Sequence, residues 1–258
     1  MDSFVLRPIY VRNAHRLLRW SKLGRCILKK LDESLLTNLP PFRKLDRSQI
    51  RQILDAATPV RINAGDAFFD QGDTAEKFFL LLDGHIRVVK MTPDGEQVIA
   101  LHIASGQLFG IAAGLGKATY PATSVAADEC LALYWPNVMW DRFVATYDGF
   151  ATETYKVVGE RLDEMNKRIV EMATQQVEQR VACVLLRLIN QAGRKVPDGI
   201  EIDFPITRQN ISDMTGTTLH TVSRLLSAWE KSGIVASKRS KVTVTEPHQL
   251  VLLSGATG

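Results

Sequence analysis

The residues best suited to chemistry in this 258-residue chain are polar and basic side chains grouped between residues 206 and 235. Two groups stand out there, Thr207-Arg208-Gln209 and His220-Thr221-Val222-Ser223-Arg224. An arginine can donate two hydrogen bonds to guanine O6 and N7 in the major groove of DNA, and serine or histidine can reach neighbouring bases. We therefore expect base contacts from His220, Ser223 and Arg224.

Other side chains of this region suit the DNA backbone rather than the bases. Phosphate contacts come from Arg, Lys, Gln and Thr side chains, and they fix the register of a protein on the duplex. For any one such residue, the alternative is an ordinary solvated polar surface. The expected backbone contacts are Arg208, Gln209, Thr218, Thr221, Lys238 and Arg239.

Two short helices must position these side chains. We predict a first helix over residues 208–214, with Ile211 on its inner side, and a turn at Gly216, where φ can be positive. Thr217 or Thr218 then caps a second helix by accepting hydrogen bonds from its backbone N–H groups. The expected buried stripe of that helix is Leu219, Val222, Leu225 or Leu226, and Trp229.

A hairpin with a basic tip is expected after the second helix. The apolar and β-branched segments 234–236 and 242–244 flank Ser237-Lys238-Arg239-Ser240-Lys241. Two strands joined by such a tip form a wing. The C-terminal part of the chain is therefore predicted to be a winged helix-turn-helix.

Residues 58–135 alternate short apolar runs with turn residues. Two of these runs are Phe78–Leu82 and Cys130–Tyr134. Asp83-Gly84 and Thr92-Pro93-Asp94-Gly95 are hairpin signals, because glycine takes the positive φ that tight turns need. Several short strands at this spacing predict a barrel or jelly roll.

Downstream of these strands the apolar residues recur with the spacing of a heptad. Steps of three and four residues place six of them on one narrow seam, which is typical of a helix that pairs with a second copy of itself. The alternative is a helix that lies on the core of its own domain. The six residues are Tyr155, Val158, Leu162, Met165, Ile169 and Met172.

Charge divides along the chain. Residues 1–37 carry a net +5, residues 38–177 a net −4, and residues 178–258 a net +3. A basic C-terminal segment fits a module that contacts phosphates. The predicted fold is α+β, with a basic N-terminal extension of unassigned function (1–37), a β-roll sensor domain (38–149), a dimerisation helix (150–176) and a winged helix-turn-helix (177–258).

Cys26, Cys130 and Cys183 lie far apart in the chain and form no CxxC pair. Their spacing therefore predicts no metal site and no cysteine-ligated cluster. We expect packed, inert thiols, and the alternative is a redox switch at Cys183. No apolar run approaches the roughly 20 residues of a membrane helix, so we expect a cytoplasmic protein.

With these motifs in place, the chain resembles the CRP/FNR family of bacterial transcription regulators over about residues 38–250. The segments that carry the resemblance are Thr207-Arg208-Gln209, Thr221-Val222-Ser223-Arg224, the glycine-punctuated β-roll and the heptad helix. The pair Ser223-Arg224 is similar to the FNR branch. The resemblance implies a cyclic-nucleotide-binding-like β-roll, a homodimer on a palindromic site with half-sites about one helical turn apart, and RNA polymerase as a partner.

One departure concerns base preference. Members of this family often carry a glutamate where this chain has His220, and a glutamate accepts from cytosine. Imidazole can donate as well as accept, so the base read at this position is open.

The resemblance also raises the question of the signal. Family members that bind cyclic AMP use a glutamate and an arginine, which the matching stretches Gly110–Ala113 and Tyr120–Thr123 lack. Lys117 is the only Lys or Arg from residue 96 to 141, and a buried phosphate needs a cation. We therefore expect neither cyclic AMP nor, with Cys26 alone near the N-terminus, an iron–sulfur cluster. Haem held by His85, His102 or methionine, an apolar small molecule, and no ligand at all stay open.

Two other classes of function compete with a DNA-binding regulator. A ligand-controlled regulatory subunit of an enzyme or channel could use the same β-roll, but it would not need a helix-turn-helix. An enzyme would need a nucleophile–base pair or metal-ligand spacing, and the β-roll sequence offers neither.

Overall fold

The computed structural model describes residues 31–255, which form two compact units. Within that range, the first unit combines residues 31–86 with 103–158, and the second combines residues 87–102 with 159–255. Cys26 and most of the predicted N-terminal extension lie outside the described residues. Each unit is described by itself below.

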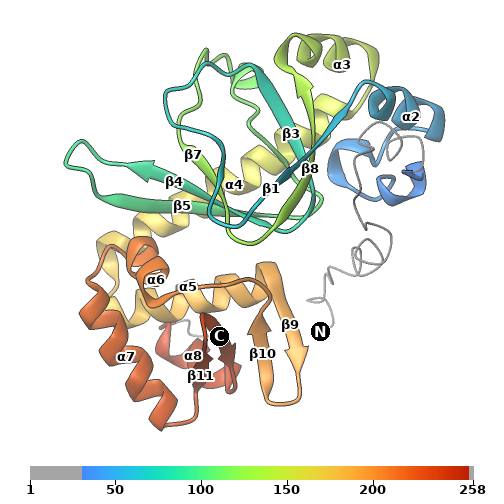
Figure 1. Ribbon diagram of the computed structural model, residues 1–258. Helices are drawn as coiled ribbons and strands as arrows, with labels where there is room; N and C mark the ends of the chain where they lie inside the picture. Colours follow the sequence, from blue (N-terminus) through green and yellow to red (C-terminus); the bar gives the residue numbers. More distant parts are fainter. Residues whose placement is uncertain (1–30, 256–258) are drawn as a thin grey trace. The chain divides into compact units, whose positions relative to one another are not determined.

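Eight strands build the predicted β-roll (Figure 1). They form two four-stranded sheets of order β1-β8-β3-β6 and β2-β7-β4-β5, and β3 pairs antiparallel with β8 so that Leu80 faces Leu133. The β-roll prediction is confirmed. The strands are β1 (Thr58–Ile62), β2 (Ala67–Phe69), β3 (Lys77–Asp83), β4 (His85–Met91), β5 (Gln97–Ala104), β6 (Leu108–Phe109), β7 (Thr123–Ala126) and β8 (Cys130–Pro136).

Gly84 makes the predicted tight turn between β3 and β4. Its φ is +93°, and a Cβ atom there would lie 2.6 Å from the Glu129 carbonyl oxygen. Any other residue would therefore clash with the Glu129 backbone and would also adopt a strained φ.

Short helices close the core of the first unit. Trp135 is fully buried, stacks on Phe78, and donates from Nε1 to the Ile53 carbonyl oxygen at 2.8 Å. This bond satisfies the one polar atom of the indole and fixes α2 on the sheet. The short helices are η2 (Glu33–Leu35), η3 (Pro40–Phe42), α2 (Arg47–Asp55), η4 (Ala113–Leu115), η5 (Asn137–Met139) and α3 (Trp140–Thr146).

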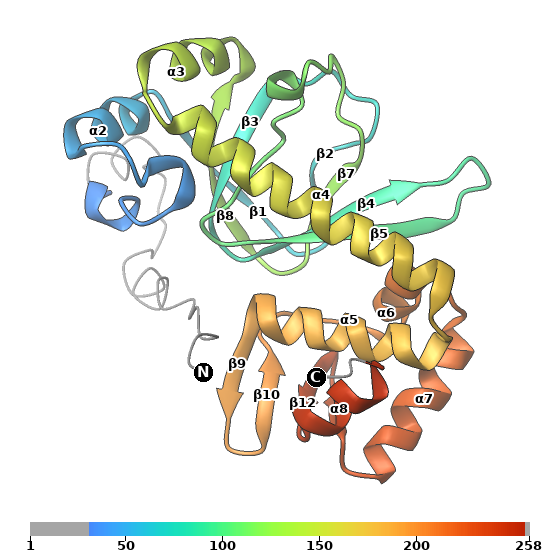
Figure 2. The ribbon, with the colours of Figure 1, turned by 180° about the vertical axis from the view of Figure 1, so that it is seen from behind.

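A long helix, α4 (Phe150–Thr174), runs where the heptad pattern predicts one (Figure 2). Phe150 is buried among aromatic residues of the first unit. Glu153 is also buried at this end, and Lys156 and Lys44 hold its carboxylate at 2.9 and 3.3 Å. Arg43 lies 4.0 Å from the same carboxylate, and these three cations fix the start of α4 in the first unit.

The second unit contains a four-stranded sheet of order β11-β12-β10-β9, with α5–α8 around it. Residues 193–199 begin and end with glycine and contain Pro197 and Asp198, which predicts a loop from sequence, and this prediction is wrong. Gly193–Val196 instead pairs with Gly199–Ile202 across a two-residue turn. The elements are α5 (Val177–Ala192), β9 (Gly193–Val196), β10 (Gly199–Ile202), α6 (Arg208–Thr215), α7 (Leu219–Lys231), β11 (Val235–Lys238), β12 (Lys241–Val244) and α8 (Pro247–Leu253).

None of the helices in the described part of the chain has the length and apolar character to span a membrane.

Candidate nucleic-acid interface

The first helix of the predicted helix-turn-helix is α6. Thr207 caps it: Asn210 N donates to Thr207 Oγ1 at 3.1 Å, and Thr207 N donates to Asn210 Oδ1 at 3.0 Å. This reciprocal pair satisfies two N–H groups at the helix start. Ile211 is buried as predicted, and Gly216 ends the helix with φ at +59°.

The second helix, α7, has Thr218 as its N-cap, with the Thr218 hydroxyl accepting from Thr221 N at 3.2 Å. Its buried stripe is Val222, Leu226 and Trp229. Leu219 was expected in this stripe, and that expectation is wrong, because its exposed fraction is 46%. Leu219 is the first residue of α7, and no other element of the described chain covers it at this end of the helix.

The side chains that we expect to read bases lie on the outer side of α7. His220 and Arg224 are exposed, and Ser223 is half-buried. Within residues 31–255, no hydrogen bond or ion pair engages the side chains of His220 or Arg224. The guanidinium of Arg224 is therefore available to a partner from outside the chain.

The residues expected to contact phosphates differ in how far other side chains of the chain already engage them. Thr218 and Thr221 lie together, with 3.0 Å between their hydroxyl oxygens. Exposed Gln209 donates from Nε2 to Asp213 at 2.7 Å. Each of these polar groups lies at the surface near the start of a helix, where backbone N–H groups favour anions.

Arg208 differs, because other residues of the chain already engage it. Its Nη2 atom lies 3.2 Å from Glu230 Oε1, and its Nη1 donates to Ser227 Oγ at 3.3 Å and to the Ser223 carbonyl oxygen at 3.4 Å. These bonds join α6 to α7. Sequence reasoning missed Glu230, because a partner 22 residues away leaves no periodic signal.

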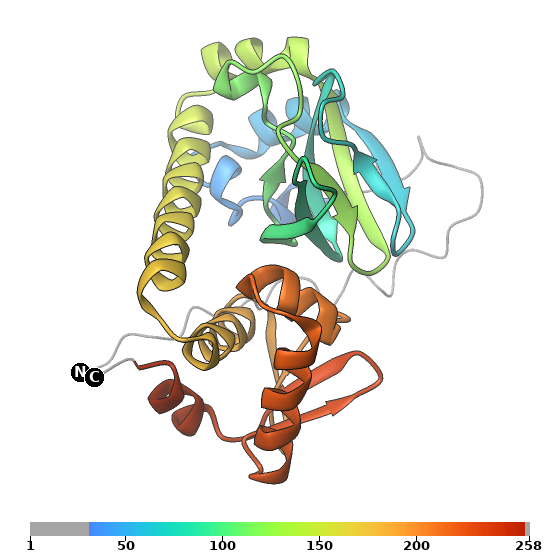
Figure 3. The same ribbon diagram turned by 90° about the vertical axis from the view of Figure 1, so that its left-hand side faces the viewer.

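The predicted wing is a hairpin of β11 and β12 beside α7 (Figure 3). Arg239 and Ser240 form its two-residue turn, with φ at +49° and +60°. This turn type matches the twist of paired strands. Lys238 and Arg239 are exposed at the tip, while Lys241 binds Glu201 of β10 at 3.0 Å.

The wing is anchored electrostatically at Glu201. Hydrogen bonds from Arg194 and Lys241 hold the pKa of Glu201 below its ordinary value, with Arg194 the larger cause. Lys241 follows the turn directly, so its ion pair ties the tip end of the wing to β10, while the exposed Lys238 and Arg239 are available to a ligand.

The heptad residues of α4 divide into two kinds. Tyr155, Leu162, Met165, Ile169 and Met172 are exposed, and Ile169 reaches 63%. Val158, the sixth, is partly buried against the core of the first unit. The alternative of a helix lying on its own core therefore applies to Val158, and Tyr155 also contacts its own unit, because its hydroxyl donates to the Gly114 carbonyl oxygen at 3.3 Å.

The segment of the β-roll that would meet an effector is filled with apolar and aromatic side chains. Tyr120 stacks on Phe69 with 3.7 Å between ring centroids, and its hydroxyl donates to the Lys77 carbonyl oxygen at 2.6 Å. Ile111 and Ala112 are buried nearby in sequence.

The candidate haem ligands have other contacts. His85 Nδ1 lies 2.9 Å from Asp128 Oδ2, and the His102 ring packs on Phe204 at 5.0 Å. Within residues 31–255, no group of three His, Cys, Asp or Glu side chains is arranged to hold a metal ion.

The two described cysteines are held in packed surroundings. Burial is the main cause that raises the pKa of the Cys130 thiol to about 12 and that raises the pKa of Cys183. Cys183 Sγ lies 3.6 Å from Gln175 Oε1 and 3.9 Å from the Ser254 carbonyl oxygen. A raised pKa disfavours the thiolate that reactive cysteines require.

Two family models match parts of this chain. Residues 179–253 match the Crp-like helix-turn-helix domain, and residues 59–147 match the cyclic nucleotide-binding domain. Electron transport regulator A of Shewanella oneidensis is 25% identical over 242 residues, which cover 92% of this chain and 94% of that protein. The fumarate and nitrate reduction regulatory protein of Escherichia coli is 24% identical over 245 residues, which cover 94% of this chain and 96% of that protein.

Solved structures share the fold. FixK2 from Bradyrhizobium japonicum superposes with a TM-score of 0.69 at 21% identity, covering 78% of this chain and 99% of that one. A CRP-family transcriptional regulator from Thermus thermophilus gives a TM-score of 0.66 at 20% identity, covering 77% of this chain and 97% of that one.

Proposed function

The chain belongs to the CRP/FNR family of DNA-binding transcription regulators, and from this premise we propose that it acts as a homodimer on a palindromic DNA site. The family consists of transcription regulators and not of enzymes. The observation that carries the proposal is the exposed, unengaged guanidinium of Arg224 on the outer side of α7, as seen within residues 31–255.

In this proposal α7 enters the major groove. Arg224 donates to guanine O6 and N7, and Ser223 and His220 contact the neighbouring bases. His220 can act as donor or acceptor there, so we propose no single base opposite it.

Phosphates on either side of the groove would be held by a second set of residues. Thr218 and Thr221 lie at the start of α7, and Gln209 lies at the start of α6. Lys238 and Arg239 at the wing tip reach the adjacent backbone. Arg208 joins this set only if it leaves Glu230, because its donors are engaged in the free chain.

The dimer would form along α4. The exposed stripe Tyr155, Leu162, Met165, Ile169 and Met172 presents apolar surface to water, and two copies packed in a coiled coil would bury it. Residues 38–149 would then serve as the sensor, 150–176 as the dimerisation helix and 177–258 as the DNA-binding domain. A signal in the sensor would change the packing of α4 and so the placement of the two recognition helices.

The signal that we propose is not cyclic AMP. The stretch around Tyr120 supplies aromatic packing where a cyclic phosphate would need a cation, and Lys117 is the one Lys or Arg between residues 96 and 141. An apolar small molecule, or no ligand, agrees better with this lining. We propose no cofactor, RNA polymerase as a partner and the cytoplasm as the site of action. An absorption spectrum of the purified protein tests for haem, whose Soret band would contradict the absence of a cofactor.

Selection of binding sites from random duplex DNA tests the proposed function. We expect a two-fold symmetric consensus whose half-sites are about one helical turn apart. The variant Arg224→Ala should lose the consensus, whereas Lys231→Ala, an exposed cation at the far end of the same helix, should retain it. Failure of the wild-type chain to enrich any sequence would contradict the proposal.

A further inference from the structure

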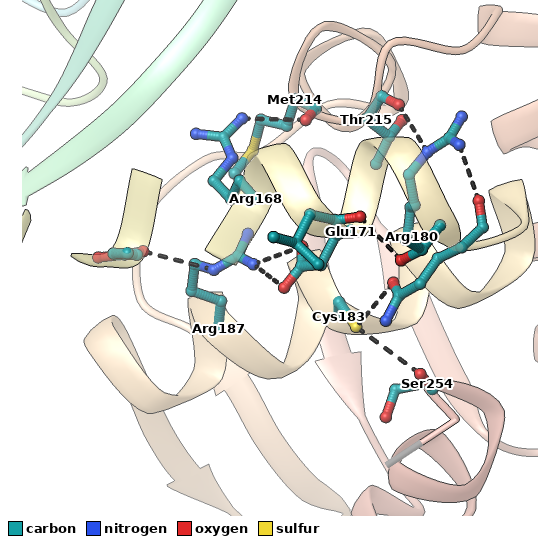
Figure 4. Close-up of polar contacts among 12 residues, drawn as sticks. Arg168, Glu171, Arg180, Cys183, Arg187, Met214, Thr215 and Ser254 are labelled. Carbon is teal, nitrogen blue, oxygen red and sulfur yellow. Dashed lines mark hydrogen bonds and ion pairs between the residues drawn. The ribbon is translucent and has the colours of Figure 1, made fainter. Parts of the chain in front are cut away.

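Two arginines from outside the winged helix-turn-helix donate hydrogen bonds to α6, one at each end of the helix. At the start, Arg87 of β4 donates from Nη1 to Asn210 Oδ1 at 3.2 Å. At the end, Arg168 of α4 donates from Nη2 to the Met214 carbonyl oxygen at 3.0 Å (Figure 4). All four residues belong to the second unit.

Arg168 makes more than this one contact. The same guanidinium donates to the backbone carbonyl oxygens of Ile99, at 3.0 Å, and Ala100, both on β5. One planar group thus joins α4, β5 and the end of α6. A guanidinium has five donors in a fixed plane and can hold three separated carbonyls, which the compact ammonium of lysine cannot match.

The positive charge of Arg168 strengthens its hydrogen bond to the end of α6. The last carbonyl groups of a helix have no partner inside it and carry the negative end of the helix dipole. Arg168 binds the Met214 carbonyl, and Arg180 of α5 donates from Nε to the Thr215 carbonyl at 3.1 Å (Figure 4). Two cations therefore hold the turn that leads directly into α7.

The neighbouring side of α4 is turned to solvent. Ile169, the next residue after Arg168, has an exposed fraction of 63%, and it belongs to the stripe that we assign to the partner copy. Successive residues of α4 therefore serve different contacts. Arg168 holds the helix-turn-helix, while Ile169 is available to the second chain.

We propose that Arg168 is a positioning residue that sets the distance between the two recognition helices of the dimer. The inference rests on the proposed function, because it needs two copies joined along α4. The dimer seam fixes α4, Arg168 fixes the end of α6 on α4, and the short turn at Gly216 carries that position into α7. Half-site spacing on DNA follows from the distance between the two α7 helices.

Operators that differ only in spacing test this inference. The consensus half-sites are synthesised at the selected spacing and at spacings up to about two base pairs shorter or longer. Affinity for each duplex is measured by fluorescence anisotropy for the wild type, Arg168→Ala and Arg168→Lys. The matched control is Lys167→Ala, which removes an exposed cation from the neighbouring position.

We expect the wild type and Lys167→Ala to bind one spacing best. Arg168→Ala should lose about tenfold in affinity at that spacing, the scale of a lost charge-assisted hydrogen bond, and should bind the other spacings nearly as well. Its salt dependence should stay unchanged, because Arg168 touches no phosphate. The affinity of Arg168→Lys at the selected spacing should lie between that of the wild type and that of Arg168→Ala. Light scattering and circular dichroism establish that each variant is a folded dimer.

The outcomes separate the two proposals. A sharp spacing preference in the wild type that survives in both Arg168 variants would overturn the inference and leave the proposed function standing. A wild-type chain without any preferred palindrome would overturn both. If Arg168→Ala does not fold, a wild-type spacing preference in folded Arg168→Lys overturns the inference, and a broadened one supports it.

Discussion

Arg208 and Glu230 face each other between α6 and α7, with 3.2 Å between Nη2 and Oε1. Neither residue is buried completely, since their side chains are exposed by 35% and 29%. The arginine that we propose as a phosphate contact is therefore held by a carboxylate of α7 in the free chain. Binding DNA through Arg208 would require exchanging one anion for another.

This pairing predicts the effect of Glu230→Gln. The substitution removes a negative charge from α7, which we propose enters the major groove, and releases Arg208, so binding to any duplex should become tighter. The slope of log affinity against log salt should steepen by up to about one, the contribution of one phosphate contact. Anisotropy titrations across salt concentrations measure both. Weaker binding with an unchanged slope would show instead that the pair positions α7.

Arg224→Ala should lower affinity by about 1–3 kcal/mol for the selected operator and should relax the preference at one base position. The reason is the loss of two hydrogen bonds to guanine. Competition binding against operators changed at each position measures the effect. Equal loss on every sequence would mean that Arg224 contacts a phosphate.

The double substitution Met165→Lys with Ile169→Lys should produce monomers. Two charges in each copy would face each other across the proposed seam, and apolar contact along α4 would be lost. Light scattering measures the mass in solution. Asn166→Lys, which adds a charge at an exposed position between them, is the control and should stay dimeric. A dimeric double variant would contradict the proposed seam.

Leu219 and Leu226 should respond differently to truncation although both are leucines of α7. Leu226 is fully buried, so Leu226→Ala should lower the free energy of unfolding by about 2–5 kcal/mol. Leu219 is 46% exposed, and Leu219→Ala should change it by less than about 0.5 kcal/mol. Urea unfolding followed by circular dichroism compares the two. A similar loss of unfolding free energy in both variants would show that Leu219 is buried in the core.

Cys130 should give the folded chain a dependence on alkaline pH. Burial, followed by Asp128, raises the pKa of the thiol from 9.0 to about 12, so between these values the folded state keeps a proton that the unfolded state releases. The contribution is full below the lower value, and it falls as pH rises, by at most about 1.4 kcal/mol per pH unit. Urea unfolding in reductant should show a shallower decline for Cys130→Ala. An equal decline of stability with pH in the wild type and in Cys130→Ala would contradict the raised pKa of Cys130.

Much of the DNA-binding unit could be predicted because its signals are local. Thr207 and Thr218 cap helices, and Gly216 takes a positive φ, for reasons contained within a few residues of each. The wing follows equally from two apolar runs around a short basic tip. Period and turn chemistry act over one or two turns of chain, so a sequence displays them directly.

Predictions that depended on what covers a residue were less secure. Leu219 has the spacing of the buried stripe, yet it lies at the first position of α7, where no described element covers it. Val158 has the spacing of the exposed stripe, yet the core of the first unit half-covers it. Residues 193–196 have loop composition, yet β10 offers them a pairing partner.

By itself, the amino-acid sequence determined the β-roll, the long helix, the helix-turn-helix and its outward arginine, because hydrophobic period, capping and turn residues specify elements within a short stretch of chain. Only the tertiary structure decided that Glu230 engages Arg208 and that Arg168 joins β5 to the end of α6, since these partners lie 22 to 69 residues apart. Contacts of that kind form where the fold brings distant segments of backbone together, and a local sequence pattern does not indicate which segments meet.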